Sequence, residues 1–290
     1  MKDDSIGILV LLGIIAIALF GGAKNTNNIG PIFSNNQAQT NVEQGIQDTQ
    51  NQINDLKQQL QIEEDKKTQS QYKGIVTLSY INRSTDPSQE YVTIKVSYGA
   101  VGTIPVTGWI LKSLDSGTQV TIPKGTYLFF TGMMNAEDDI YLNANDVLYL
   151  ITGISPVGAS FKVNKCSGYL GQFQTFIPYL NTNCPAPRNE DLSSIPNSVR
   201  NGACLDYIDS MNQCQIRTES PLVNWSSECI DFIYNKINYP SCVDIHKNDG
   251  DFYEKEWRVY LKRSESIWRD KRETIVLYDN VGKIVDTLKY

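Results

Sequence analysis

The sequence has few of the residues that catalysis or metal binding usually requires. It contains one histidine, His246, which stands beside Lys247 where a loop begins. Serine and cysteine triads need a histidine to accept a proton, and no GxSxG or papain-type cysteine motif accompanies this one. Close CxxC or HxxxH pairs, a P-loop and a GxGxxG motif are also missing, which argues against zinc and nucleotide sites. We therefore expect a protein that is not an enzyme and carries no cofactor.

Positive charge is scarce as well. The chain has 26 Lys and Arg against 32 Asp and Glu, a formal net charge of -6, which disfavours general attraction to nucleic acid. Basic residues nevertheless gather in residues 255–272 among three aromatic residues, where they suggest contact with phosphate, nucleic acid or an anionic glycan. The candidates for this contact are Arg258, Lys262, Arg263, Arg269 and Arg272. The same alternation fits a half-buried strand with a solvated outer face, which we favour.

An unbroken apolar run, residues 6–20, lies near the N-terminus. With the following Gly and Ala residues it is almost long enough to cross a bilayer, so we expect residues 1–23 to form a single-pass transmembrane helix or signal anchor. Gly21 and Ala23 also permit reading the segment as a cleaved leader, and a buried helix of a soluble protein is the third alternative. On the first two interpretations, the C-terminal part of the chain is extracytoplasmic.

All six cysteines lie far beyond this run, which favours disulfides formed in an oxidising compartment. They are Cys166, Cys184, Cys204, Cys214, Cys229 and Cys242. Six cysteines permit fifteen pairings. If two antiparallel helices face each other, we expect Cys214 to pair with Cys229 and Cys204 with Cys242, which leaves Cys166 for Cys184.

Two segments separate the apolar run from the rest of the chain. Residues 24–41 are rich in Asn, Gln and Thr and predict a flexible linker. From residue 42 to 70, apolar residues recur at heptad spacing and predict a coiled-coil stalk, with a helix over about 38–70. Positions a are Ile46, Ile53 and Leu60, and positions d are Val42, Thr49 and Leu56. The stalk is either a solvated single helix or a surface for self-association.

The middle of the chain alternates apolar and polar residues in short runs bounded by turn residues, the pattern of a β-sandwich or barrel. The expected strands are 74–81, 91–98, around Trp109, one ending at Ile122, 126–132, 146–152 and 159–163, with a terminal hairpin of 274–278 and 283–288 that turns at Gly282. We expect Trp109, Trp257 and Trp268 to lie in the core or at its edge.

Several of these motifs occur in an order that resembles a lamin tail domain. They are Glu90-Tyr91-Val92, Thr107-Gly108-Trp109-Ile110-Leu111, Ile122-Pro123-Lys124-Gly125, Asp146-Val147-Leu148-Tyr149-Leu150, and the two closing runs 275–279 and 281–286. The resemblance covers about residues 73–175 and 256–290. It implies an immunoglobulin-like β-sandwich, of a type that also occurs in exported bacterial proteins, and an association with DNA.

Residues 176–255 depart from that pattern and predict a helical hairpin clamped by disulfides. Apolar residues recur at helical spacing at Leu205, Ile208 and Met211, and again at Ile230, Ile233 and Ile237. Ser226 and Ser227 are expected N-caps of the second helix, with Pro221 and Pro240 outside the helices.

Acidic residues in turns suggest two weaker alternatives. Asn143, Asn145 and Asp146 form one set of oxygen ligands suited to calcium, and Asn248, Asp249 and Asp251 form another, although neither has EF-hand spacing. Glu137, Asp138 and Asp139 are adjacent, whereas a glycosidase needs two acids across a cleft. We expect these residues to be ordinary turns.

The sequence therefore predicts a mainly β fold with an α insertion: an immunoglobulin-like β-sandwich preceded by an N-terminal transmembrane helix and a coiled-coil stalk. The expected function is membrane-anchored extracytoplasmic display or binding, as a scaffold or an adhesion-like protein. Its expected partners are the membrane, an envelope polymer, a surface protein or another copy. Two alternatives are a surface module that binds nucleic acid through residues 255–272, and an envelope hydrolase whose carboxylates converge only in the fold.

Overall fold

The computed structural model describes residues 36–196, 198, 201–221, 224–269 and 271–290. The predicted transmembrane helix, residues 1–23, and residues 24–35 of the predicted linker lie outside this part of the chain. Among the described residues, none of the helices combines the length and apolar character needed to cross a bilayer. The chain divides into two compact units, residues 1–60 and residues 61–290.

Helix α2, Asn36–Thr68, is formed largely by Gln, Glu, Lys and Leu, which are strong helix formers. It agrees with the helix expected over about 38–70, and it includes residues 36–41, which the sequence assigned to the linker. Ile46, Leu56 and Leu60 of the heptad seam are 64%, 49% and 58% exposed. These three apolar side chains of the seam are therefore exposed on α2.

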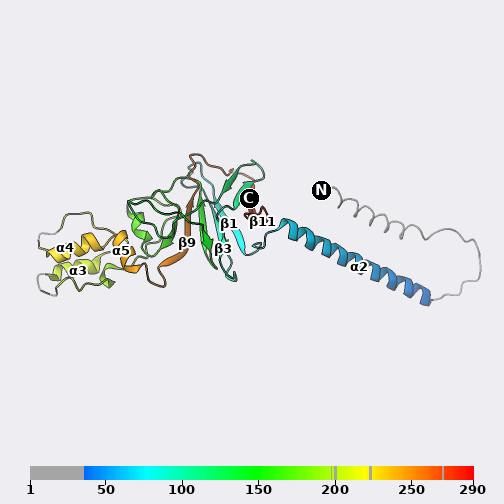
Figure 1. The fold of residues 1–290 in the computed structure, drawn as a ribbon, viewed down its shortest axis with the longest axis horizontal. Coiled ribbons are helices and arrows are strands. Elements are labelled where there is room, and N and C mark those ends of the chain that lie inside the picture. The colour runs from blue at the N-terminus through cyan, green and yellow to red at the C-terminus, as the bar shows by residue number, and fades with distance from the viewer. Residues whose placement is uncertain (1–35, 197, 199–200, 222–223, 270) are drawn as a thin grey trace, which may run out of the picture. The chain divides into compact units, whose positions relative to one another are not determined.

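Two main sheets form the body of residues 61–290, as Figure 1 shows. The first has the order β1 (Val76–Asn82), β2 (Tyr91–Val96), β7 (Val147–Ile151), β9 (Tyr253–Tyr260) and β8 (Phe161–Asn164). Its strands pair antiparallel except for β7 and β9, which are parallel. The insertion therefore separates β8 from β9 in the sequence, and β9 pairs with β7 after the chain has passed through it.

The second sheet has the order β11 (Ile284–Lys289), β10 (Thr274–Tyr278), β4 (Ile110–Ser113) and β5 (Gln119–Thr121). Two short strands, β3 (Ile104–Pro105) and β6 (Tyr141–Leu142), pair separately. The predicted terminal hairpin of β10 and β11 is confirmed. Gly282 adopts a φ of 79° in its turn, a conformation that glycine tolerates without strain.

Side chains from both main sheets form one apolar core. Trp109, Trp257 and Trp268 are 0%, 0% and 5% exposed within it, as predicted. Gly108, with a φ of 85°, provides the turn that brings Trp109 into the core. The mainly β fold with an α insertion, the two packed sheets and the participation of the cysteines in disulfides are confirmed.

The prediction of a strand over residues 126–132 is wrong. This segment makes only isolated bridges, at Gly125 and Thr126, before it leaves the sheet. The Asn135 side chain accepts a hydrogen bond from the Phe130 amide at 2.7 Å and donates one to the Phe130 carbonyl at 3.0 Å. This side chain replaces the partner strand that Phe130 would otherwise need, while Phe129 is buried against the insertion.

The insertion contains three short α-helices instead of the expected pair. Its described elements are η2 (Pro187–Asn189), α3 (Gly202–Ser210), α4 (Ser227–Asp231), η4 (Phe232–Lys236, a π-helix) and α5 (Tyr239–His246), and η1 (Ser167–Gln172) precedes it. The predicted cap at Ser226 is confirmed, since its side chain accepts a hydrogen bond from the Cys229 amide. Pro240 was expected outside a helix and instead stands in the first turn of α5, where its missing N–H costs nothing.

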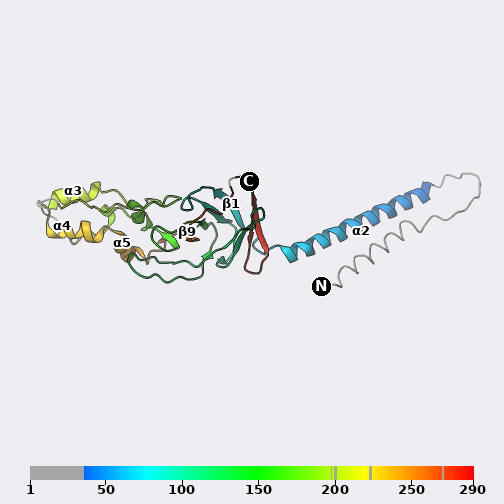
Figure 2. The same ribbon diagram turned by 90° about the horizontal axis from the view of Figure 1, so that it is seen from above.

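The insertion covers the face of the first sheet that points away from the second sheet. Phe161 and Val163 of β8, Ile151 of β7 and Tyr260 of β9 form a separate apolar cluster with residues of the insertion. Figures 1 and 2 both show α3, α4 and α5 gathered at the end of this unit that lies away from β1 and β11. The first sheet is therefore packed on both faces at β7, β8 and β9.

Candidate binding site

Three disulfides fix the insertion, but the predicted pairings are wrong. The bonds join Cys166 to Cys242, Cys184 to Cys214 and Cys204 to Cys229. Helix α3 ends at Ser210, so Cys214 lies in the following loop and reaches the segment before η2. Helix α5 carries Cys242 back to the end of β8, where Cys166 lies, so that this bond ties the insertion to the sheet.

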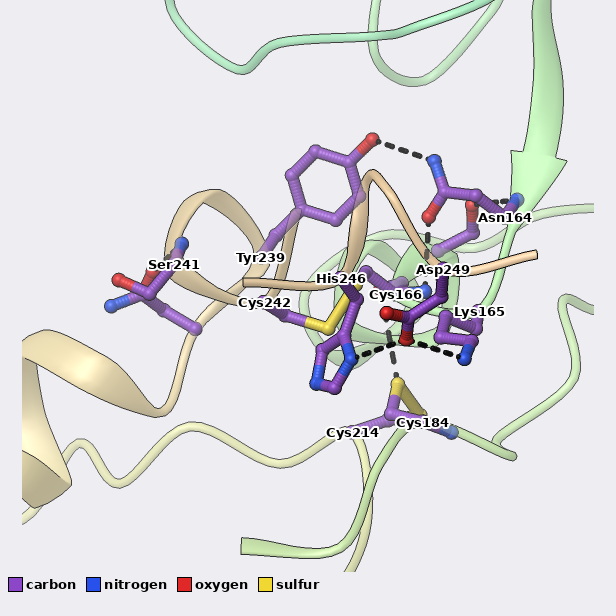
Figure 3. Close-up of a disulfide and its surroundings, with 12 residues drawn as sticks. Asn164, Lys165, Cys166, Cys184, Cys214, Tyr239, Ser241, Cys242, His246 and Asp249 are labelled. Carbon is purple, nitrogen blue, oxygen red and sulfur yellow. Dashed lines mark hydrogen bonds and ion pairs between the residues drawn. A yellow bond between two sulfur atoms is a disulfide. The ribbon is translucent and has the colours of Figure 1, made fainter. Parts of the chain in front are cut away.

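A charged network lies beside the Cys166–Cys242 bond, as Figure 3 shows. His246, in the last turn of α5, contacts Asp249 through Nδ1 at 2.8 Å and Glu190 through Nε2 at 3.1 Å. Lys165 donates to Asp249 at 2.9 Å and to Asp251 at 2.6 Å. Both ring nitrogens of the histidine are thus engaged by carboxylates, and neither faces a hydroxyl or a thiol.

The network favours a protonated histidine. Burial lowers the pKa of His246, but the hydrogen bonds with Glu190 and Asp249 outweigh it and raise the pKa above its ordinary value. The Lys165 ammonium, followed by His246, lowers the pKa of Asp249. The arrangement therefore joins η2, α5 and the end of β8 as ion pairs, which is a structural role.

Arg258 is the one anion-contact candidate that the structure removes from the surface. It is 1% exposed, because the insertion covers the face of β9 that was expected to be solvated. Its guanidinium donates to Glu256 Oε1 at 2.6 Å, to the Pro178 carbonyl and, at 3.1 Å, to the Tyr179 carbonyl. Arg258 thus holds the loop of residues 173–182 on the sheet and is not available to an external anion.

The remaining basic candidates are exposed but do not form one site. Lys262 lies 3.7 Å from Glu137 in an exposed ion pair. Arg263, Arg269 and Arg272 are exposed in the connection from β9 to β10. The observed structure brings none of these four side chains into either of the hollows described below.

The two calcium candidates are occupied by protein cations. Asp146 is buried and forms an ion pair with Lys162 at 3.4 Å, so an ammonium stands where a metal ion would have to bind. Asp249 and Asp251 are bound by Lys165. No group of three or more His, Cys, Asp or Glu side chains in the described ranges is arranged to hold a metal ion.

One buried carboxyl, Glu90, and one half-buried carboxyl, Glu256, have raised pKa values, the signal expected of a hydrolase. Burial raises the pKa of Glu90 and that of Glu256. Glu90, however, accepts hydrogen bonds from the Thr152 hydroxyl at 2.6 Å and from the Ile267 and Trp268 amides at 2.9 and 3.1 Å. It fixes the connection between β9 and β10, while Glu256 pairs with Arg258, so both have structural partners. Of the acidic turn, Asp139 pairs with Lys124 at the surface.

A cavity lies at the start of the insertion, between residues 168–182 and residues 212–215. This hollow, called the amide hollow below, has a volume of about 720 Å³. Its polar lining consists of Gln172, Gln174, Thr175, Thr182, Asn212, Gln213 and Gln215, with Phe176, Tyr179 and Leu180 as apolar walls. It contains no Asp, Glu, Lys, Arg or His side chain.

Internal hydrogen bonds set the shape of the amide hollow. Gln172 donates to the Ile216 carbonyl at 2.9 Å and accepts from the Ile216 amide at 2.7 Å. Gln213 donates to the Cys184 carbonyl at 2.6 Å. The Cys184–Cys214 bond holds the same two loops together. The hollow is therefore a preformed site, which limits the ordering cost of binding.

Sequence reasoning missed this site because it placed a domain boundary at residue 176, inside the lining. The signal was a set of amide residues close to cysteines, in residues 171–174 and 212–215. No protein-family model matches this chain, and no curated protein matches it either. The resemblance to lamin tail domains thus stays a prediction based on the motifs named above.

Proposed function

We propose that this chain is a membrane-anchored, extracytoplasmic binding protein without catalytic activity, and that the amide hollow is its binding site. The observation that carries the proposal is a preformed, uncharged cavity of about 720 Å³ in an insertion tied down by three disulfides. Small-molecule and polymer sites are concave, with a few oriented polar groups. Disulfides persist outside the reducing cytosol, which supports the location.

The other parts of the chain have supporting roles in this proposal. The apolar run of residues 6–20 anchors the protein, and α2 separates the binding unit from the membrane. Because Ile46, Leu56 and Leu60 are exposed at heptad spacing, we propose that α2 also pairs with α2 of another copy. We further propose that the two-sheet body is an immunoglobulin-like sandwich of the lamin tail type. Five of the six motifs of that resemblance fall on β2, β4, β7, β10 and β11, and Ile122-Pro123-Lys124-Gly125 directly follows β5.

The ligand class on this proposal is an envelope polymer or a surface protein of the producing cell. The full chain in non-ionic detergent is mixed with envelope fragments of the producing organism that lack the protein, and its co-sedimentation is measured. Thr182→Trp places a bulky ring in the amide hollow. Thr287→Trp is the matched control, because Thr287 is exposed on β11, on the other sheet.

We expect the unmodified chain and Thr287→Trp to co-sediment and Thr182→Trp to bind at least about tenfold more weakly, a loss of about 1.4 kcal/mol. Equal binding by all three proteins, or no co-sedimentation of the unmodified chain, would contradict the proposal. An epitope inserted between Met133 and Met134, which are 68% and 100% exposed, should be detected on intact cells. Detection only after lysis would contradict the location.

A further inference from the structure

A second hollow adjoins the amide hollow and shares part of its wall. It has a volume of about 390 Å³ and is lined by Asp86, Ser88, Ile154, Ile177 and Tyr260, among others. Thr175 and Tyr179 line both hollows. The two cavities therefore share one wall, and an extended ligand that passes over it can occupy both.

The charge of the lining indicates which polymers fit. The amide hollow has no ionisable lining side chain other than Tyr179. The second hollow has one ionised side chain, Asp86, since hydrogen bonds from Ser88 lower the pKa of its carboxyl. A polyanion such as nucleic acid or an acidic glycan would meet no cation in either hollow and one carboxylate in the second. The linings therefore favour an uncharged ligand.

The polar groups of the linings match hydroxyl groups, which both donate and accept hydrogen bonds. Amide side chains have the same dual capacity. Within the described part of the chain, the side chains of Gln174, Thr175 and Thr182 make no hydrogen bond, so they are available to a ligand. The walls thus offer donors and acceptors without charge.

Tyr179 supplies an apolar surface between the hollows. Its side chain is 78% exposed, yet its backbone is fixed because Arg258 donates to the carbonyls of Pro178 and Tyr179. An aromatic side chain has only two χ angles to order, so it gives contact area at little entropic cost. The C–H face of a sugar ring is an apolar plane of similar size that can lie flat on such a ring.

Tyr260 gives an independent indication of a ligand. It is 3% exposed and lines the second hollow, and its hydroxyl has no hydrogen-bond partner among the described residues. A buried hydroxyl without a partner is unfavourable, because the hydrogen bonds it made with water are not replaced. Protein atoms cover this oxygen, so a ligand hydroxyl in the second hollow would become its partner through a small shift of the Tyr260 side chain.

We infer that the site binds an uncharged polysaccharide, with one sugar ring on Tyr179 and neighbouring rings in the two hollows. This inference rests on the proposed binding function and specifies its ligand class. It is tested by affinity electrophoresis of the full chain in detergent, with dextran, laminarin or galactomannan in the gel, and with alginate or duplex DNA as charged comparisons. Tyr179→Ala and Tyr260→Phe are compared with Tyr98→Ala, since Tyr98 is 86% exposed and lies on the sandwich.

We expect at least one of the three neutral polysaccharides to retard the unmodified chain and Tyr98→Ala. Binding by Tyr179→Ala should be about tenfold weaker, the upper range for one aromatic contact. Tyr260→Phe, which removes only one oxygen atom, should also bind more weakly. The inference is overturned if none of the neutral polysaccharides binds, if only alginate or DNA binds, or if Tyr179→Ala binds as tightly as Tyr98→Ala.

Periodate, which cleaves the vicinal diols of glycans, separates this inference from the proposed function. Because a 1,3-linked glycan such as laminarin has no vicinal diols within its chain, an excess of the three neutral polysaccharides is added as competitor beside the periodate treatment. If the envelopes bind the chain despite both treatments and Thr182→Trp still abolishes that binding, the glycan inference fails and the binding function stands. If untreated envelopes do not bind the unmodified chain at all, both fail. Loss of binding after periodate treatment supports both.

Discussion

Replacing Arg258 by alanine should loosen the insertion from the sheet and disturb the amide hollow. The guanidinium lies 4.7 Å from the centre of the Tyr149 ring and pairs with Glu256. It also holds the carbonyls of Pro178 and Tyr179, and Tyr179 lines both hollows. The substitution removes all of these contacts at once, without touching the amide lining itself.

The cost can be worked out from the groups that lose their partner. Removing one partner of a buried ion pair typically costs about 3–5 kcal/mol. Because the Glu256 side chain is 25% exposed, water recovers part of that loss, so we use the lower end of the range. Each unsatisfied carbonyl adds about 1 kcal/mol, also reduced by partial access to water. We expect Arg258→Ala to lower the free energy of unfolding by about 3–4 kcal/mol.

Urea unfolding of the full chain in detergent, followed by tryptophan fluorescence, measures this loss. Arg263→Ala is the matched control, since Arg263 is exposed in the same basic stretch and should change stability by less than about 0.5 kcal/mol. Arg258→Met combined with Glu256→Gln should recover part of the loss, because no unpaired charge remains. A loss below about 1 kcal/mol for Arg258→Ala, or a double variant no more stable than the single one, would refute the reasoning.

Three further predictions concern other contacts of the same unit. Glu90→Gln replaces an acceptor oxygen by an NH₂ group that faces N–H donors. Urea unfolding should therefore show that the free energy of unfolding falls by about 2–3 kcal/mol. A fall of less than about 1 kcal/mol would contradict the structural role of Glu90. The raised pKa of His246 stabilises the fold below its unfolded pKa of about 6.5 and ceases to do so as pH rises through the folded value. Thermal melting should therefore show this decline in the unmodified chain and not in His246→Gln. Gly168→Ala should weaken envelope binding, because its Cβ would lie 2.6 Å from the Asn181 carbonyl oxygen. Gly171→Ala should leave binding unchanged, because no atom lies within 4 Å of its Cβ. Equal binding by the two variants would argue against a rigid hollow.

Local chemistry made several elements predictable. The turn at Gly282, the cap at Ser226 and the helix over about 38–70 each depend on residues that are close in sequence. The core position of Trp109 follows from its place between a glycine and an alternating strand that begins at Ile110. In these cases the residues that determine the structure and the structure itself occupy the same short segment.

Contacts between distant segments were not predictable in the same way. An alternating strand at residues 257–262 has the same pattern whether its second face meets water or an insertion, so the burial of Arg258 could not be read from it. The disulfide pairing depended on α5, whose Pro240 was taken as a helix boundary although proline is favoured in a first turn. The amide hollow is formed by two loops about 40 residues apart, which no local period connects.

The most direct test of the account is a disulfide map of the chain purified from its native membrane. The protein is alkylated without reduction, digested and analysed by mass spectrometry. We expect no alkylated cysteine and three linked pairs, Cys166–Cys242, Cys184–Cys214 and Cys204–Cys229. Cysteines that react with the alkylating reagent before reduction would contradict both the three disulfides of the insertion and its location in an oxidising compartment. A different set of pairs would contradict the geometry of the binding site.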